Sequence, residues 1–183
     1  KPWVSHREFA DLAAQFDTAL TAVHGQVIRT NSLETAVTAL AELMLEIGVK
    51  TAVANSEEPL TSLNLPATFP NIQWHLVDQT PGSLREFCTS ADIGISGGEV
   101  GLAETGSVVI TSGPGKSRLA TLLPPVHVVL LPTSKLTSDL FTCAARGSCD
   151  RVVVRSARVA GFTTSQLGGR PTLGTNRAVV LFF

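Results

Sequence analysis

A chain of 183 residues with 44% hydrophobic and only 16% charged residues is long enough to fill a core, and this composition excludes a disordered protein. The formal net charge of -1 provides no long-range field for nucleic acid, and the lysines and arginines are scattered, so nucleic-acid binding is not expected. We therefore expect a single domain over residues 1–183.

Cysteine usage and apolar segments indicate the compartment. The three cysteines, Cys88, Cys143 and Cys149, are odd in number and form no C-x-x-C pair, so buried free thiols are favoured over disulfides, zinc or iron–sulfur sites. The most apolar segment, 119–131, contains two prolines and is shorter than the about 20 residues of a membrane span. No secretory signal is visible, and the sequence predicts a cytoplasmic protein without a membrane span.

Helical and strand patterns alternate along the chain. A capping box at Ser5–Glu8 begins the first helical pattern, and prolines turn the stretch 55–70 into a surface connection with short helices at most. Short apolar runs bounded by Gly, Pro or Asp are typical of strands that are covered on both faces. Helices are predicted from Ser5–Glu8 to about Leu20 and at 33–47, 81–88, 116–123 and 135–146, and strands at 26–29, 51–54, 72–77, 93–95, 108–111, 126–131, 151–155 and 178–182.

This alternation predicts an α/β fold. We expect a three-layer α/β/α sandwich with a mostly parallel sheet and right-handed crossovers. The runs 93–95 and 108–111 are joined without a full helix, so a hairpin, and with it a mixed sheet, stays open. Since ligands bind at the carboxyl ends of strands in such sheets, we place the function in the stretch Ala91–Pro132.

Glu104 is the first candidate for chemistry in this stretch. It follows a Gly-rich bend and stands directly before an apolar run, where an unpaired carboxylate would be costly to bury. Either it faces a cleft as base, nucleophile or ligand anchor, or it only ties the turn by accepting backbone N–H bonds, and both interpretations stay open. The cleft interpretation would add glycine amides and hydroxyls from Gly97, Gly98, Thr105, Gly106 and Ser107.

A basic turn and a histidine are the other candidates. The segment S-G-P-G-K-S-R at 112–118 resembles a phosphate loop, but Ile110 stands where the full pattern needs glycine, so a nucleoside triphosphatase is not expected. An anion site at Lys116 and Arg118 remains, against a solvent-exposed turn, which is slightly favoured. His127 lies inside an apolar run, where a hydrogen-bonded core role is favoured over a functional one. No metal-ligand spacing, nucleophile elbow or triad is present, and a hydrolase is not expected.

Two linked motifs of the central stretch resemble the LUD-domain family, in its lactate-utilisation protein C group. They are G-I-S-G-G-E-V-G-L-A-E-T-G-S-V-V-I at 94–110 and R-L-A-T-L-L-P-P-V-H-V-V at 118–129. The resemblance implies a fold similar to that of ribose-phosphate isomerases, glucosamine-phosphate deaminases and CoA transferases. It also implies a role in oxidising L-lactate to pyruvate beside separate iron–sulfur subunits, with no cofactor in this chain.

The resemblance also ranks the site residues. It places Glu104, Thr105 and Gly106 first and His127 next, and it implies a small anionic metabolite bound near Glu104. Two alternatives stay open: a stand-alone enzyme similar to CoA transferases or sugar-phosphate isomerases that uses Glu104, and a non-catalytic assembly or regulatory subunit. The latter is favoured by residues 156–163, which lack two acids that the family tends to carry there.

Overall fold

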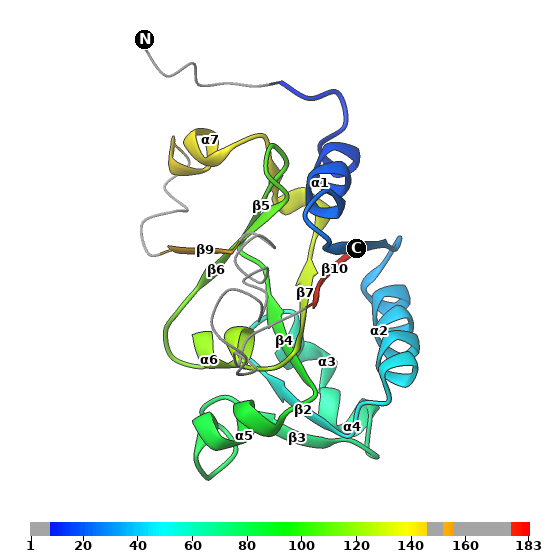
Figure 1. Cartoon of the computed structure of the whole chain (residues 1–183), viewed down its shortest axis with the longest axis vertical. Coiled ribbons are helices and arrows are strands. Elements are labelled where there is room, and N and C mark those ends of the chain that lie inside the picture. The colour runs from blue at the N-terminus through cyan, green and yellow to red at the C-terminus, as the bar shows by residue number, and fades with distance from the viewer. Residues whose placement is uncertain (1–7, 146–151, 156–176) are drawn as a thin grey trace, which may run out of the picture.

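The computed structural model describes residues 8–145, 152–155 and 177–183. Its main sheet has six strands, all parallel, in the order β1-β10-β7-β4-β2-β3 (Figure 1). These strands are β1 (Gln26–Arg29), β10 (Arg177–Phe182), β7 (Val126–Leu131), β4 (Ile93–Gly97), β2 (Thr51–Ala54) and β3 (Gln73–Leu76).

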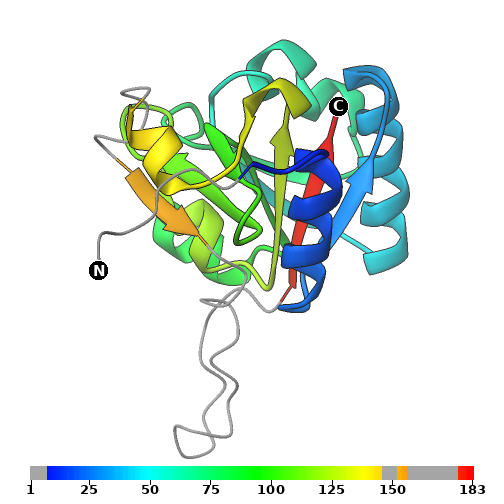
Figure 2. The same ribbon diagram turned by 90° about the horizontal axis from the view of Figure 1, so that it is seen from above.

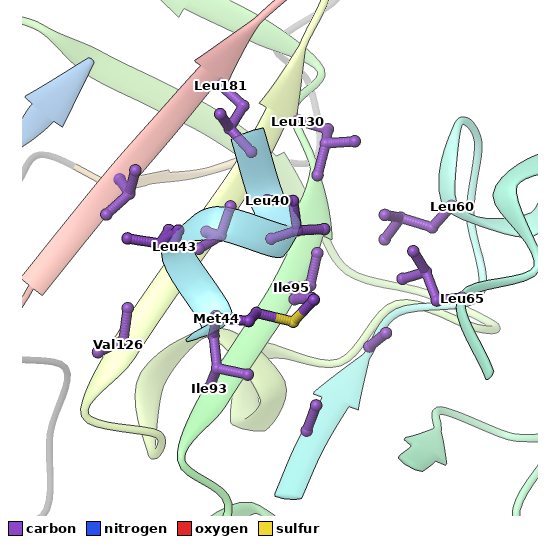
Figure 3. Close-up of a cluster of buried hydrophobic side chains, with 14 residues drawn as sticks. Leu40, Leu43, Met44, Leu60, Leu65, Ile93, Ile95, Val126, Leu130 and Leu181 are labelled. Carbon is purple, nitrogen blue, oxygen red and sulfur yellow. The ribbon is translucent and has the colours of Figure 1, made fainter. Parts of the chain in front are cut away.

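One face of the main sheet is covered by α2 (Leu33–Ile47), α3 (Leu60–Leu63) and α4 (Leu65–Thr68). Figure 3 shows Leu40 and Met44 of α2 gathered with Ile93 and Ile95 of β4 in one buried cluster. Full burial of each such aliphatic side chain stabilises the fold by about 1.5–3 kcal/mol. This face therefore forms a continuous hydrophobic core.

Clear local signals set the limits of α2. The Ser32 side chain accepts a hydrogen bond from the backbone N–H of Thr35, and the Thr35 side chain accepts one from the backbone N–H of Ser32. Gly48 ends the helix in the left-handed region, with φ +73°. The predicted bounds of this helix are confirmed.

The opposite face is covered by α1 (Leu12–Thr21), α5 (Leu84–Ser90), α6 (Arg118–Leu122) and a second sheet. In the second sheet the order is β8 (Leu136–Thr137), β5 (Val100–Leu102), β6 (Ser107–Thr111) and β9 (Val152–Arg155). The pairs β5–β6 and β6–β9 are antiparallel and β5–β8 is parallel. In Figure 2, β9 in orange lies on the other side of the central strands from α2 in blue and cyan. The three predicted layers are present, and the mixed pairing belongs to this second sheet.

Most predicted elements are confirmed, including the strands at 26–29, 51–54 and 126–131. The predicted helix at 135–146 is wrong in its first half, because η1 (Thr133–Lys135) and β8 precede α7 (Leu140–Ala145). The cause is backbone pairing of Leu136 with Gly101 of β5, which sequence periodicity does not contain. The first helix begins later than expected, with Asp11 as its N-cap. The described helices include none that combines the length and apolar character needed to cross a membrane.

The cysteine prediction is confirmed for one residue and wrong for another. Cys88 is a buried free thiol, and burial raises its pKa to about 11. Cys143 is disulfide-bonded, so the prediction of free thiols fails there. Cys149, most of the capping box Ser5–Glu8 and the departure from the family pattern at 156–163 lie outside the described residues. The single domain over 1–183 stays a prediction.

Asp92 fastens the start of β4 to the start of β2. Its Oδ2 accepts the backbone N–H of Lys50 at 2.8 Å, the backbone N–H of Thr51 at 2.9 Å and the Thr51 hydroxyl at 2.9 Å. Burial by itself raises the pKa of this carboxyl, but the hydrogen bonds from Lys50 and Thr51 outweigh it and leave the pKa below its usual value. The ionised form is therefore favoured by folding.

We expect Asp92→Asn to lower the free energy of unfolding at neutral pH by about 1 kcal/mol, since water competes for part of these bonds. A lowered native pKa stabilises the fold above the unfolded-state pKa of about 3.9 and loses that contribution as the pH falls through the native value. The gap between the parent protein and the variant should therefore narrow below about pH 4 in urea titrations. A gap that stays constant from pH 7 to pH 3 would contradict this role.

Candidate functional site

The chain leaves β2 and β4 toward opposite faces of the main sheet. β2 continues into α3 and α4, on the face of α2, whereas β4 continues into β5 and the second sheet on the other face. β2 and β4 are neighbours in the sheet. In open α/β sheets, ligands bind outside the carboxyl ends of two strands that diverge in this way. The candidate site therefore lies at the carboxyl ends of β2 and β4.

Glu57 is the central side chain at this edge. Its Oε1 accepts the backbone N–H of Gly97 at 3.0 Å and the Asn55 side-chain amide at 3.1 Å. Its Oε2 lies 3.2 Å from the Lys116 ammonium, which also donates to the Thr111 hydroxyl at 3.1 Å. The Glu57 side chain is only 8% exposed and that of Lys116 is 30% exposed. We call Asn55, Glu57, Gly97, Thr111 and Lys116 the edge cluster.

The basic turn at residues 112–118 lies over the carboxyl ends of β2 and β3. The backbone N–H of Ser56 donates to the Gly115 carbonyl at 2.7 Å, and the Gly115 N–H donates to the Asp78 carboxylate at 2.6 Å. The Ser117 N–H donates to the Asn55 side chain at 3.0 Å. The segment 113–117 is therefore tied to the ends of β2 and β3.

The two cations of this turn differ in their surroundings. Lys116 is half-buried and ion-paired with Glu57, so an anion there must compete with a carboxylate. Arg118, at the start of α6, is exposed. The prediction that this turn is solvent-exposed is confirmed for Arg118 and wrong for Lys116.

The amides of Gly97 and Gly98 have partners within the chain. Gly97 donates to Glu57 and Gly98 donates to the Leu130 carbonyl at 3.0 Å. A Cβ on Gly97 would lie 2.8 Å from a carbonyl oxygen of Glu58, and a Cβ on Gly98 would lie 2.8 Å from the Leu131 side chain. Close packing therefore accounts for both glycines. The Lys135 ammonium donates to the Gly98 carbonyl at 3.1 Å and adds a second cation at this edge.

Glu104 lies elsewhere, on the turn between β5 and β6. Its backbone N–H donates to the Ser138 carbonyl at 2.9 Å, the Thr105 hydroxyl donates to the Ser107 hydroxyl at 2.8 Å, and Glu104 is half-buried. Ser107 begins β6, whereas Thr111 at the other end of β6 contacts Lys116. The length of β6 therefore separates the Glu104 turn from the edge cluster.

His127 is a core residue of β7. It is 2% exposed, and its Nε2 lies 2.9 Å from the Ser96 hydroxyl of β4. The predicted hydrogen-bonded core histidine is confirmed. The predicted site residues thus occupy four places: the edge with Gly97, Gly98 and Lys116, the exposed start of α6 with Arg118, the turn with Glu104, Thr105, Gly106 and Ser107, and the interior with His127.

Sequence reasoning missed Asn55, Glu57 and Lys135. Asn55 and Glu57 stand directly after the predicted strand 51–54, so the rule that ligands bind at carboxyl ends was a signal for them. Lys135 gave no such signal, because it was assigned to a helix. Among the residues that the structure describes, no group of three or more His, Cys, Asp or Glu is placed to hold a metal ion.

Comparisons with known proteins agree with this architecture. The model of the LUD domain family matches residues 13–148. The chain is 32% identical over 137 residues to lactate utilization protein C of Halalkalibacterium halodurans, covering 69% of this chain and 58% of that protein. It is 29% identical over 136 residues to lactate utilization protein C 1 of Bacillus mycoides, covering 71% and 57%. The chain therefore spans less than two thirds of the length of these relatives.

A solved structure shows the same fold. The crystal structure of a DUF162 family protein from Deinococcus radiodurans superposes with a TM-score of 0.70 at 16% identity, covering 97% of this chain and 99% of that chain. At this identity the likeness concerns the fold alone. The predicted α/β class is confirmed.

Proposed function

The chain belongs to the LUD domain family, and we propose that it takes part in the utilisation of L-lactate in the cytoplasm by binding a small carboxylate such as lactate or pyruvate. The observation that carries this proposal is the similarity to lactate utilization protein C over 69% of the chain. Oxidation of lactate to pyruvate releases two electrons and two protons. In this proposal, iron–sulfur clusters of separate partner subunits take up the electrons.

The edge cluster and Lys135 support a carboxylate site at the end of β4. Lys116 and Lys135 approach the backbone of Gly97 and Gly98, one through Glu57 and the other directly. An ammonium has three N–H donors, and the contacts described above use two on Lys116 and one on Lys135. A carboxylate at this edge would receive charge-assisted hydrogen bonds from both.

The Glu104 turn serves a different role in the proposal. A carboxylate repels the carboxylate of lactate, so Glu104 would instead accept the proton or the hydrogen bond of the lactate hydroxyl. Thr105 and Ser107 supply hydroxyls on the same turn. Should the metabolite bind here, the chain would resemble a stand-alone enzyme that uses Glu104. Should it bind in neither place, the non-catalytic subunit is the remaining alternative.

Calorimetric titration with lactate and pyruvate tests the proposal. We expect Lys135→Ala and Lys116→Met to weaken binding at least about tenfold, because each removes a charge-assisted hydrogen bond. The exposed Lys50→Ala is the matched control and should bind like the parent chain. A loss confined to Glu104→Gln would move the site to the turn. Absence of binding to the parent chain would overturn the carboxylate proposal.

Incubation with acyl-CoA distinguishes the enzymatic alternative from the carboxylate-binding proposal. A stand-alone enzyme similar to CoA transferases would form a covalent adduct on Glu104, which intact-protein mass spectrometry detects and Glu104→Gln abolishes. In the proposal favoured here, incubation with acyl-CoA leaves the mass unchanged.

A further inference from the structure

A separate cavity of about 120 Å³ lies beside the edge cluster, between the carboxyl ends of β2 and β3 and the short helices α3 and α4. Its apolar side is made by Leu60, Leu65 and Leu76. Ser56, Asn64 and Gln79 provide polar groups, and both Asn64 and Gln79 are exposed. It is therefore a small crevice with an apolar lining and carboxamides at its rim.

The cavity lining contains no ionisable side chain, so an anion would find no counter-charge there. Carboxylates lie just outside it. Glu58 accepts the hydroxyl of the lining residue Thr61, and Asp78 precedes the lining residue Gln79. These charges repel phosphate and carboxylate groups. The crevice therefore favours a neutral ligand, unlike the lysine-bearing edge.

The volume of the cavity and its hydrogen-bonding groups narrow the class of ligand further. An apolar cavity of about 150 Å³ holds one benzene ring, so about 120 Å³ corresponds to a single small ring. A carboxamide offers two donors and an acceptor, and Asn64 and Gln79 present two of these groups. They complement a ring whose edge carries its own amide.

The topology places a switch point next to this cavity, which itself lies at the ends of β2 and β3. From β3 the main sheet runs β3-β2-β4-β7-β10, which is the strand order 2-1-3-4-5 of the flavodoxin-like sheets. Those sheets bind a ring-bearing ligand at the point that corresponds to the ends of β2 and β4. Asn55 belongs to both the edge cluster and the cavity lining, so the two are adjacent.

We propose that this cavity binds the neutral amide-bearing ring of a nicotinamide or pyrimidine compound. The inference is independent of the lactate proposal, because it uses different side chains and a ligand of different charge. The ring packs on Leu60, Leu65 and Leu76, and its amide edge pairs with Asn64 and Gln79 at the rim.

Titrations followed by NMR with nicotinamide, uracil and nicotinate, using the whole chain, test this inference. Nicotinamide or uracil should perturb the signals of the lining residues, and the comparison of the two identifies the ring type. Nicotinate has the same ring with a carboxylate and should bind at least about tenfold more weakly than nicotinamide. Equal binding of nicotinate and nicotinamide, or no perturbation by either neutral ring, would overturn the proposal.

Two variants test whether Asn64 and Gln79 contact the ligand. Gln79→Ala and Asn64→Gly each remove one carboxamide, and glycine tolerates the φ of +43° at position 64. Each should weaken binding about threefold to tenfold, the effect of one neutral hydrogen bond. Gln73→Ala removes an exposed carboxamide on β3 outside the cavity and should have no effect. An equal loss in Gln73→Ala, or no loss in the other two variants, would contradict this assignment.

Discussion

Gly94→Ala is expected to lower the free energy of unfolding by about 3 kcal/mol or more. A Cβ at this position of β4 would lie 1.9 Å from the carbonyl oxygen of Ala120 in α6 and 3.1 Å from the Pro124 side chain. The nearest atom belongs to the backbone, so no side-chain rotation relieves the contact. The helix α6 would have to move away from the sheet, at the cost of packing on both sides of it.

This effect is measured by comparing the urea unfolding of Gly94→Ala with that of Gly113→Ala. Nothing lies within 4 Å of a Cβ on Gly113, which makes it a control for the loss of backbone freedom alone. We expect Gly113→Ala to stay within about 1 kcal/mol of the parent chain. A Gly94→Ala variant as stable as the control would show that α6 does not rest on β4 as described.

The contact at Gly94 also explains part of the family-like pattern. The two motifs of the sequence, 94–110 and 118–129, are adjacent in space because the backbones of Gly94 and Ala120 touch. His127 in the second motif lies 2.9 Å from Ser96 in the first. Helix α6 and strand β7 of the second motif thus both pack against β4. Much of the pattern that identifies the family therefore encodes this packing, and a residue inside it need not contact a ligand.

Elements with a strong local signal were predictable. The β-branched runs of β6 and β7 and the capped helix α2 carry their pattern within a few residues. The three-residue strand β5 and the two-residue strand β8 do not, because they are defined by backbone pairing, of Gly101 with Val108 and of Leu136 with Gly101. Local periodicity therefore predicted the main sheet and the strands β6 and β9 of the second sheet, and it missed β5 and β8.

The edge cluster is only partly contained in the sequence pattern. The carboxyl ends of the strands were expected to hold it, and Lys116 was among the expected residues. Its partner Glu57 follows a different strand, and only the pairing of β2 with β4 brings the two ends together. Glycines that a sequence presents as a ligand cradle, such as Gly97 and Gly98, prove to be sites of close packing. Sequence alone does not separate these two uses of glycine.

Gly106→Ala is the second replacement for which we expect a large effect, a loss of about 3–5 kcal/mol in unfolding free energy. Gly106 closes the turn that carries Glu104, with φ +63°, and donates to the Leu102 carbonyl at 2.9 Å. Its Cβ would lie 2.4 Å from the backbone nitrogen of Leu20 near the end of α1. Two penalties therefore combine, the positive φ and a collision with helix backbone.

Gly48→Ala separates these penalties, because Gly48 has φ +73° and open space within 4 Å of its Cβ position. It should cost about 1–2 kcal/mol in the same urea titration, the price of the dihedral alone. Equal losses in Gly48→Ala and Gly106→Ala would show that the turn does not press on α1. If Gly106→Ala is destabilised more than Gly48→Ala, the turn that carries Glu104 has been displaced. A loss of lactate or pyruvate binding in Gly106→Ala would then follow from this displacement. Only Glu104→Gln, which leaves the backbone of that turn unchanged, then tests whether its carboxylate takes part in binding.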